Sequence, residues 1–347
     1  MKFLPLVASL GALAVLGCTS DSPTESSVPE AGPFSAASSA ASNSWTSRAA
    51  YPAPGLFGSV AATAPNSAGQ SIVYLMAGTD GEGGTQYPVK AYNVATNTWS
   101  YKTGRAQVFY PNGAAKLGSR IYFSGGYNAV ETPSSFDNRL WAYDYAHDRM
   151  IQKANLPIFG AEGVSGVISG KLYVLPGACS GDRYPNPGYC REEPTRRFYR
   201  YDPGANAWSQ LPSSPHRHRL GGAAVLNGKF YVIAGFSAFD PVADLDVYNP
   251  GTNSWKSLAR IPTAGPAIAD VIQGKLFVVV AGSDGLHSYA YNSNTNSWSA
   301  RPAPAHGHDA LVRVILNGSA RLLAVGGSEV GQGPAALDPV VSELYTP

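Results

Sequence analysis

A motif that recurs about every 50 residues constrains the fold of this chain more than any other feature. In each copy a tyrosine lies seven residues before a tryptophan, which one copy replaces with methionine. An asparagine lies two residues before each tryptophan, in a polar turn between two expected strands. Such self-similarity is typical of propellers and other repeat architectures. The pairs are Tyr92 and Trp99, Tyr143 and Met150, Tyr201 and Trp208, Tyr248 and Trp255, and Tyr291 and Trp298.

An apolar run that ends in glycine precedes each tyrosine. Two examples are KLYVLPG, ending at Gly177, and KFYVIAG, ending at Gly235. Their alternating and β-branched character predicts strands, and six such strands predict six blades. Only 14% of the residues are charged, while 38 are glycine and 20 are tyrosine, which favours an all-β fold. The runs end at Gly78, Gly126, Gly177, Gly235, Gly282 and Gly327.

This arrangement resembles the kelch repeat, in which a glycine ends the second strand, a tyrosine lies on the third and a tryptophan begins the fourth. The resemblance covers residues 44–347 and implies an all-β, six-bladed propeller. Met150 replaces tryptophan in the second blade, where Trp141 lies on the third strand, so we expect local repacking there. The tryptophans expected to fill the wedges between blades are Trp45, Trp99, Trp208, Trp255 and Trp298.

The two ends of the repeat region complement each other. Tyr345 is followed by only two residues, so the last blade lacks its tryptophan strand. The missing Asn-x-Trp signature occurs at the other end, in Asn43-Ser44-Trp45. We therefore expect the N-terminal strand to complete the C-terminal blade and close the ring, which removes exposed strand edges.

The N-terminal segment predicts export and lipidation. Residues 1–17 are typical of a signal peptide, with an apolar run too short to span a bilayer. Val15-Leu16-Gly17-Cys18 resembles the bacterial lipobox, which implies acylation of Cys18; an uncleaved start with an incidental cysteine is the alternative. Residues 18–43 are rich in Ser, Ala and Pro and are expected to form a disordered tether. We expect a lipid-anchored protein of the bacterial cell envelope, in the outer membrane, facing the periplasm or the cell surface.

The net charge, the cysteines and the absence of known motifs limit the classes of ligand and of chemistry that we expect. The net charge of +2 and the lack of a basic run argue against nucleic acid. Cys179 and Cys190 form an even pair in an oxidising compartment and are expected to be bridged. The chain carries no phosphate-binding glycine loop before a helix, no Gly-x-Ser-x-Gly and no His-Glu-x-x-His motif. We expect no cofactor, and a monomer because nothing signals an oligomer.

Candidate binding residues fall in two classes of loop that emerge on one face of a propeller. One class joins the second and third strands of a blade, and the other joins the fourth strand to the next blade. Tyrosine and arginine gather there, and these residue types dominate interaction hot spots. The ligand-binding candidates are Arg105, Tyr110, Arg183, Tyr184, Tyr189, His216, His218, His306 and His308.

The two histidine pairs lie at equivalent positions, each in the loop that leads into the first strand of a blade. Histidines two apart on an extended chain point the same way, so His216 with His218, or His306 with His308, could each donate two metal ligands. No third or fourth ligand is evident, and solvated loop histidines or a polar channel lining are the favoured interpretation. We assign no metal.

Two functions remain open. The favoured hypothesis is a noncatalytic module that recognises a glycan or a protein through its loop-rich face. The alternative is a sugar mutarotase or epimerase, because the chain resembles the kelch-type N-acetylneuraminate epimerases. A copper enzyme like galactose oxidase is disfavoured, because its copper site needs a cysteine and both Cys179 and Cys190 are expected to be bridged to each other. Catalysis would use Glu162, His218, Arg219 and His308 as acid, base or positioning groups. Their convergence on one pocket would favour the enzyme, and their scatter would favour the binder.

Overall fold

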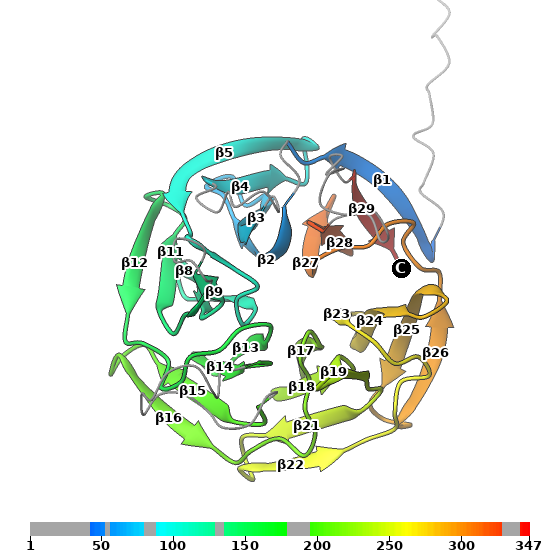
Figure 1. Ribbon diagram of the computed structural model, residues 1–347. Helices are drawn as coiled ribbons and strands as arrows, with labels where there is room; N and C mark the ends of the chain where they lie inside the picture. The colour runs from blue at the N-terminus through cyan, green and yellow to red at the C-terminus, as the bar shows by residue number, and fades with distance from the viewer. Residues whose placement is uncertain (1–41, 53–55, 80–87, 129–134, 179–194, 328–340) are drawn as a thin grey trace, which may run out of the picture. The chain divides into compact units, whose positions relative to one another are not determined.

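Six four-stranded antiparallel sheets form a ring (Figure 1), and we call the space along its axis, where a cavity lies, the channel. The computed structural model describes residues 42–52, 56–79, 88–128, 135–178, 195–327 and 341–347, all within the compact unit Ala40–Pro347. These residues form strands and turns, and no helix occurs among them. In particular, none of them forms a helix long and apolar enough to cross a membrane. The expectation of an all-β, six-bladed propeller is confirmed.

The four strands of each blade are given below in order from the channel to the outer rim, so the first is innermost and the last is outermost. Blade 1 contains β2 (Phe57–Pro65), β3 (Ser71–Thr79), β4 (Pro88–Asn93) and β5 (Thr98–Arg105). Blade 2 contains β7 (Ala114–Leu117), β8 (Arg120–Ser124), β11 (Leu140–Asp144) and β12 (Arg149–Lys153). Blade 3 contains β13 (Val164–Ile168), β14 (Lys171–Leu175), β15 (Phe198–Asp202) and β16 (Ala207–Leu211). Blade 4 contains β17 (Gly222–Leu226), β18 (Lys229–Ile233), β21 (Leu245–Asn249) and β22 (Ser254–Ser257). Blade 5 contains β23 (Ala267–Ile272), β24 (Lys275–Gly282), β25 (Gly285–Asn292) and β26 (Ser297–Arg301). Blade 6 contains β27 (Ala310–Leu316), β28 (Ser319–Val325), β29 (Val341–Thr346) and β1 (Ser44–Ala50).

Two small sheets lie in the connections at one end of the channel, the end where the second strands finish; we call this end the loop face. A three-stranded sheet contains β6 (Val108–Phe109), β9 (Tyr127–Asn128) and β10 (Ser135–Phe136). A hairpin contains β19 (Phe236–Ser237) and β20 (Asp240–Pro241). These sheets place additional side chains around the channel opening.

The ring closes as the sequence predicts. β1 pairs with β29 in antiparallel register, with Trp45 opposite Tyr345. β1 also reaches blade 1, because Arg48 donates hydrogen bonds to the hydroxyl of Tyr92 and to the carbonyl of Val94, at 3.1 and 2.9 Å. The first strand in the sequence therefore joins the last blade to the first one.

The hydrophobic core is divided among the six interfaces between blades. Between blades 3 and 4, for example, the ring of Phe198 lies 5.4 Å from that of Phe230 and 4.9 Å from that of Trp255, measured between centroids. Burying an aromatic side chain removes roughly 150–250 Å² from water, worth about 4–6 kcal/mol gross. Each blade thus depends on both neighbours for its stability.

The recurring tyrosine and asparagine form the same hydrogen bond in every blade. The tyrosine hydroxyl on the third strand donates to the side-chain oxygen of an asparagine, or in blade 2 an aspartate, at 2.6–2.7 Å. The acceptor residues have positive φ angles between 49° and 58°, which asparagine and aspartate tolerate better than most residues. The pairs are Tyr92 and Asn97, Tyr143 and Asp148, Tyr201 and Asn206, Tyr248 and Asn253, Tyr291 and Asn296, and Tyr345 and Asn43.

The tryptophans connect neighbouring blades through their indole nitrogens. Each Nε1 donates to a main-chain carbonyl of the preceding blade or of the segment that leaves it, at 2.7–3.2 Å. The acceptors for Trp45, Trp99, Trp208, Trp255 and Trp298 belong to Pro302, Ala49, Ala154, Pro212 and Ala259.

Blade 2, with Met150, uses a carboxylate in place of the indole. Asp148 accepts hydrogen bonds from the main-chain nitrogens of Thr103 and Gly104 and from the Thr103 hydroxyl, at 2.6–3.1 Å. The local repacking expected there therefore includes a polar link to blade 1.

Candidate functional site

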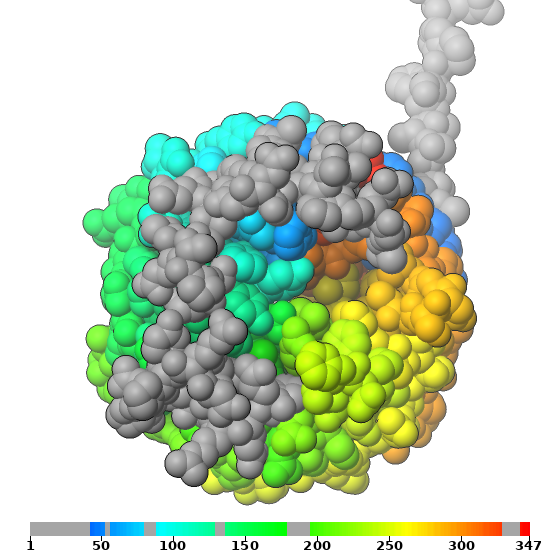
Figure 2. All heavy atoms as spheres, viewed as in Figure 1, coloured from blue at the N-terminus to red at the C-terminus, as the bar shows by residue number. Residues whose placement is uncertain are grey.

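A cavity of about 460 Å³ occupies the loop-face end of the channel and is lined by residues of all six innermost strands. Figure 2 shows this face of the molecule, which is hollowed near its centre. Small residues dominate the wall, among them Gly58, Gly113, Gly222 and Ala269. At Gly113 a Cβ would lie 2.7 Å from the main-chain nitrogen of Ser165, so the close approach of blades 2 and 3 requires glycine. These small residues leave room for a ligand group at the centre of the ring.

A collar of main-chain hydrogen bonds surrounds the cavity mouth. Gly58, Tyr110, Glu162 and Leu220 come from successive blades, and their φ angles lie between 51° and 67°. This left-handed conformation is uncommon for residues other than glycine. The bonds run from Tyr110 N to Gly58 O, Glu162 N to Tyr110 O, Leu220 N to Glu162 O and Ala267 N to Leu220 O, at 2.7–3.0 Å. The backbone at the mouth is thereby held from blade to blade.

Asp309 continues the collar between blades 6 and 1. One carboxylate oxygen accepts hydrogen bonds from the main-chain nitrogen and the hydroxyl of Ser59, at 2.9 and 2.7 Å. Burial raises the pKa of Asp309 above its ordinary value, and hydrogen bonds from Ser59, Gly58 and Gly327 oppose that rise. The Asp309 carboxyl group is therefore both a structural link and part of the cavity wall.

Glu162 and Arg219 form an ion pair at the mouth. The guanidinium meets the carboxylate through two nitrogens, Nε to Oε2 and Nη2 to Oε1, the latter at 3.1 Å. The Glu162 side chain is 7% exposed and the Arg219 side chain 28%. Glu162 lines the cavity, while Arg219 does not. Two of the four catalytic candidates are thus in contact.

Five half-buried aromatic rings lie beside the mouth, and we call them the aromatic cluster. Phe57, Phe109, Tyr110, Tyr127 and Phe136 pack with centroid distances between 4.8 and 6.4 Å. Three of these residues belong to the small sheet of β6, β9 and β10. Burial, together with the nearby carboxyl groups of Asp309 and Glu162, raises the pKa of Tyr110 to about 12, so its phenol remains protonated at neutral pH.

The β19–β20 hairpin presents an exposed aromatic ring on the same face. Phe239 lies at its tip and is 89% exposed. The base of the hairpin is fixed, because Phe236 and Arg219 exchange two main-chain hydrogen bonds of 2.7 and 3.1 Å. The hairpin is therefore mounted directly on the arginine that pairs with Glu162.

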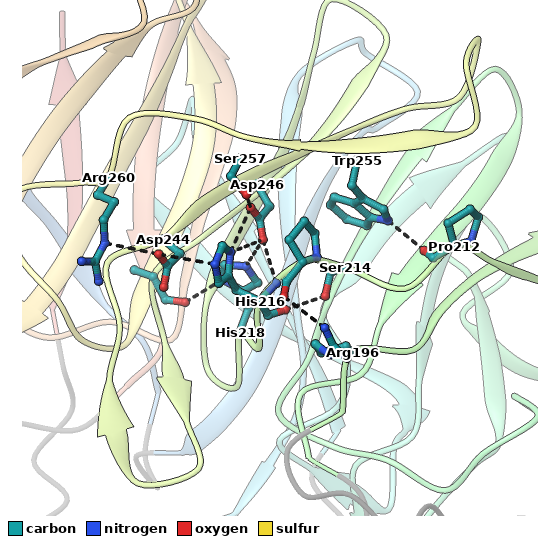
Figure 3. A network of polar contacts seen from close by, with 12 residues as sticks. Arg196, Pro212, Ser214, His216, His218, Asp244, Asp246, Trp255, Ser257 and Arg260 are labelled. Carbon is teal, nitrogen blue, oxygen red and sulfur yellow. Dashed lines mark hydrogen bonds and ion pairs between the residues drawn. The ribbon is translucent and has the colours of Figure 1, made fainter.

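The first histidine pair holds a buried carboxylate (Figure 3). His216 Nδ1 and His218 Nε2 lie 3.0 and 3.1 Å from Asp246 Oδ2, and His218 Nδ1 lies 2.9 Å from the carbonyl of Ala234. Both ring nitrogens of His218 therefore lie within hydrogen-bond distance of an oxygen atom. Burial favours neutral Asp246, but hydrogen bonds from His218 and Ser257 hold the pKa of Asp246 below its ordinary value.

The second pair repeats this arrangement on blade 6. His306 Nδ1 and His308 Nε2 lie 3.2 and 2.9 Å from Glu343 Oε2, and His308 Nδ1 lies 3.2 Å from the carbonyl of Gly326. Burial opposes ionisation of Glu343, but hydrogen bonds from His308 and from the main-chain nitrogens of Ala305 and His306 lower the pKa of Glu343 to about 2. We call each assembly of two histidines and a carboxylate a histidine clip.

The histidine clips show where the four histidines considered as possible metal ligands lie. The histidines of each pair point the same way, as expected, but toward a carboxylate within the fold. Both inner rings, His218 and His308, have side chains that are 0% exposed. Among the described residues, no group of three or more His, Cys, Asp or Glu side chains could hold a metal ion.

The catalytic candidates converge only in part, because Glu162 and His308 line the cavity whereas Arg219 and His218 do not. Glu162 and Arg219 meet at the cavity mouth, whereas the rings of His218 and His308 are enclosed in separate histidine clips on blades 4 and 6. Arg105 is exposed at the end of the outermost strand of blade 1 and does not line the cavity. The predictions for Cys18, Cys179, Arg183, Tyr184, Tyr189 and Cys190 fall outside the described residues.

Sequence reasoning missed most of the mouth. Asp309 directly follows the pair His306 and His308, and its sequence context predicts only a polar loop. Phe57, Phe109 and Tyr127 lie far apart in the sequence, and their packing depends on the small sheet that joins three connections. Exposed Phe239 could have been suspected from the FSAFDP segment, in which apolar and turn-forming residues mix.

Comparison with known sequences points to one type of repeat. The family model described as Kelch motif matches residues 217–262. The Kelch-like protein terF of Aspergillus terreus is 26% identical over 280 residues, covering 75% of this chain and 58% of its own length. Kelch-like protein 36 of Bos taurus is 26% identical over 163 residues, covering 45% of this chain and 24% of its own length. This chain therefore spans 58% of the length of the first of these relatives and less of the second.

Comparison with solved structures agrees. The structure titled "Structure of YjhT" superposes with a TM-score of 0.61 at 15% identity, covering 80% of this chain and 92% of the other. At this identity the likeness concerns the fold. With the six blades, the recurring tyrosine, asparagine and tryptophan contacts and these similarities, the chain is a β-propeller of the kelch-repeat type.

Proposed function

We propose that this chain is a noncatalytic recognition module that binds a protein ligand through its loop face. The observation that carries this proposal is Phe239, 89% exposed at the tip of a hairpin whose base is hydrogen-bonded to Arg219. Aromatic rings are frequent hot spots of protein interfaces once a partner buries them. Kelch propellers generally mediate protein interactions, which supports a protein partner.

A capture experiment tests this proposal. The purified chain is immobilised and exposed to envelope extract, and the bound proteins are compared with those bound by Phe239→Ser and by Tyr101→Ser. Tyr101 is the matched control, because it is also an exposed aromatic residue, at 52%, but lies on the outermost strand β5. We expect Phe239→Ser to lose a specific band that Tyr101→Ser retains. Equal capture by both variants would move the interface away from the loop face.

Sugar binding is a second candidate, favoured by the composition of the mouth. Phe57, Tyr110 and Glu162 line a cavity of about 460 Å³, and aromatic faces beside carboxylates suit a hydroxylated ring. Mutarotase or epimerase chemistry would have to use Glu162 and Arg219, since the two inner histidines are enclosed. Glycan-array binding together with faster anomer exchange would favour this function over protein recognition.

We also propose that the propeller is displayed at the bacterial outer membrane by a lipid on Cys18, on the basis of the lipobox-like sequence. Cys18→Ser should prevent incorporation of labelled palmitate and release the chain from membrane fractions. Cys179→Ser is the control that should leave both unchanged. Retention of the label in Cys18→Ser would contradict lipidation at this residue.

A further inference from the structure

The carboxyl groups in the described wall of the cavity have no lysine or arginine beside them in that wall. Among the described residues that line the cavity there is no lysine or arginine, but there are two carboxyl groups, of Glu162 and Asp309. His308 also lines it, yet its side chain is 0% exposed and its ring nitrogens face Glu343 and Gly326. The guanidinium of Arg219 is engaged with Glu162. An anionic group entering the mouth would therefore meet carboxyl groups without a cation on the described wall.

Aromatic faces lie at the same mouth. Phe57 and Tyr110 both line the cavity, with ring centroids 6.0 Å apart. The face of an aromatic ring attracts cations, and the attraction strengthens where water is excluded. A cation would also favour the ionised form of Asp309, whose pKa burial raises.

We propose that the mouth of the cavity receives a cationic group of the protein ligand, namely a lysine or arginine side chain or a chain amino terminus. This inference rests on the proposed function and names the chemistry of its partner. The group enters the cavity beside the rings of Phe57 and Tyr110 and is held by the carboxylates of Glu162 and Asp309. Ligands that carry a carboxylate in the same position are rejected.

Matched peptides test the preference directly. The full-length chain in detergent is titrated with the end-blocked peptides Gly-Gly-Lys-Gly-Gly, Gly-Gly-Gln-Gly-Gly and Gly-Gly-Glu-Gly-Gly, and binding is followed by saturation-transfer NMR. We expect the lysine peptide to bind at least about tenfold more tightly than the glutamate peptide, with the glutamine peptide between them. Equal binding, or tighter binding of the glutamate peptide, would overturn the inference.

Two variants that break the same ion pair distinguish charge recognition from a structural effect. Arg219→Gln leaves the carboxylate of Glu162 without its guanidinium partner and should strengthen binding of the lysine peptide about fivefold to tenfold. Glu162→Gln leaves the guanidinium without its carboxylate and should weaken it by a similar factor, while binding of the glutamate peptide rises. Loss of lysine-peptide binding in both variants would contradict the proposal, provided that thermal melting shows both to be folded.

The peptide and capture experiments can fail separately. If the lysine peptide does not bind but capture still depends on Phe239, the charge preference is wrong and the recognition module stands. If the peptides discriminate but Phe239→Ser captures normally, the mouth is a cation site and the hairpin is not part of the interface.

Discussion

At the scale of single residues, blade 2 shows how one substitution is compensated by another. Met150 cannot donate the hydrogen bond that an indole gives in the other blades. Asp148, two residues earlier, has a second carboxylate oxygen that asparagine lacks, and it accepts from Thr103 and Gly104 of blade 1 as well as from Tyr143. Burial opposes ionisation, but these hydrogen bonds hold the pKa of Asp148 below its ordinary value.

Asp148→Asn should therefore destabilise the propeller although asparagine is the ordinary residue at this position. One acceptor oxygen is lost and the charge is removed, which should lower the free energy of unfolding by about 1–2 kcal/mol. Chemical denaturation followed by circular dichroism measures the change. The reverse change Asn206→Asp in blade 3, where Trp208 is present, is the control and should bring no comparable loss.

The histidine clips predict acid sensitivity. The pKa of Glu343 falls from 4.5 to about 2 on folding, so the folded state binds fewer protons than the unfolded state between these values. The stabilisation is present above pH 4.5 and is lost as the pH falls toward 2, by an amount on the order of 3 kcal/mol. Denaturation at a series of pH values should show this slope, and Glu343→Gln should flatten it. An unchanged slope in the variant would assign the acid sensitivity to other carboxyl groups.

At the scale of elements, β1 contributes to two blades. It completes the sheet of blade 6, and the main-chain nitrogen of Ala49 also donates to the side chain of Asn97 in blade 1, at 2.8 Å. The carbonyl of Ala49 in turn accepts from the indole of Trp99. β1 therefore forms hydrogen bonds with both the last blade and the first one.

Deletion of residues 44–50 should therefore destabilise the whole domain and not only blade 6. It exposes an edge of β29, the ring of Tyr345 and the acceptor groups that Trp45 and Arg48 bind. Thermal melting by circular dichroism should show a large drop relative to a chain that begins at Ser42, which retains β1. Equal melting temperatures would mean that β1 is dispensable for closure.

The elements were predictable because each carries its own signal. Alternation, terminal glycines and the Tyr–Asn–Trp spacing determine strands and turns locally, so six blades and the closing strand follow from the sequence. The site was predicted only in part, because its groups meet through blade-to-blade contacts. Glu162 and Arg219 are 57 positions apart and pair across blades 3 and 4, and the carboxylates of the histidine clips lie on third strands, with no local pattern linking Asp246 to His218.

At the scale of the whole molecule, the ring distributes its core so that no blade has one of its own. Each hydrophobic cluster takes residues from two blades, and the indole bonds and the collar cross the same interfaces. Loosening one interface exposes faces on two blades at once, which in turn weakens the next interfaces. The described propeller should therefore unfold as one cooperative unit, despite its construction from repeats.

Trp255→Phe tests this cooperativity at the interface of blades 3 and 4. The phenyl ring preserves much of the packing against Phe198 and Tyr248 but loses the hydrogen bond to the carbonyl of Pro212, at 2.8 Å. We expect the free energy of unfolding to fall by about 1 kcal/mol, with the midpoint shifted and the transition still single. Circular dichroism and the fluorescence of the remaining tryptophans should give coincident curves, since these residues report from the other interfaces. Separate transitions for the two signals would show that blades can unfold while the ring remains partly assembled, and each interface would then have to be treated as an independent unit.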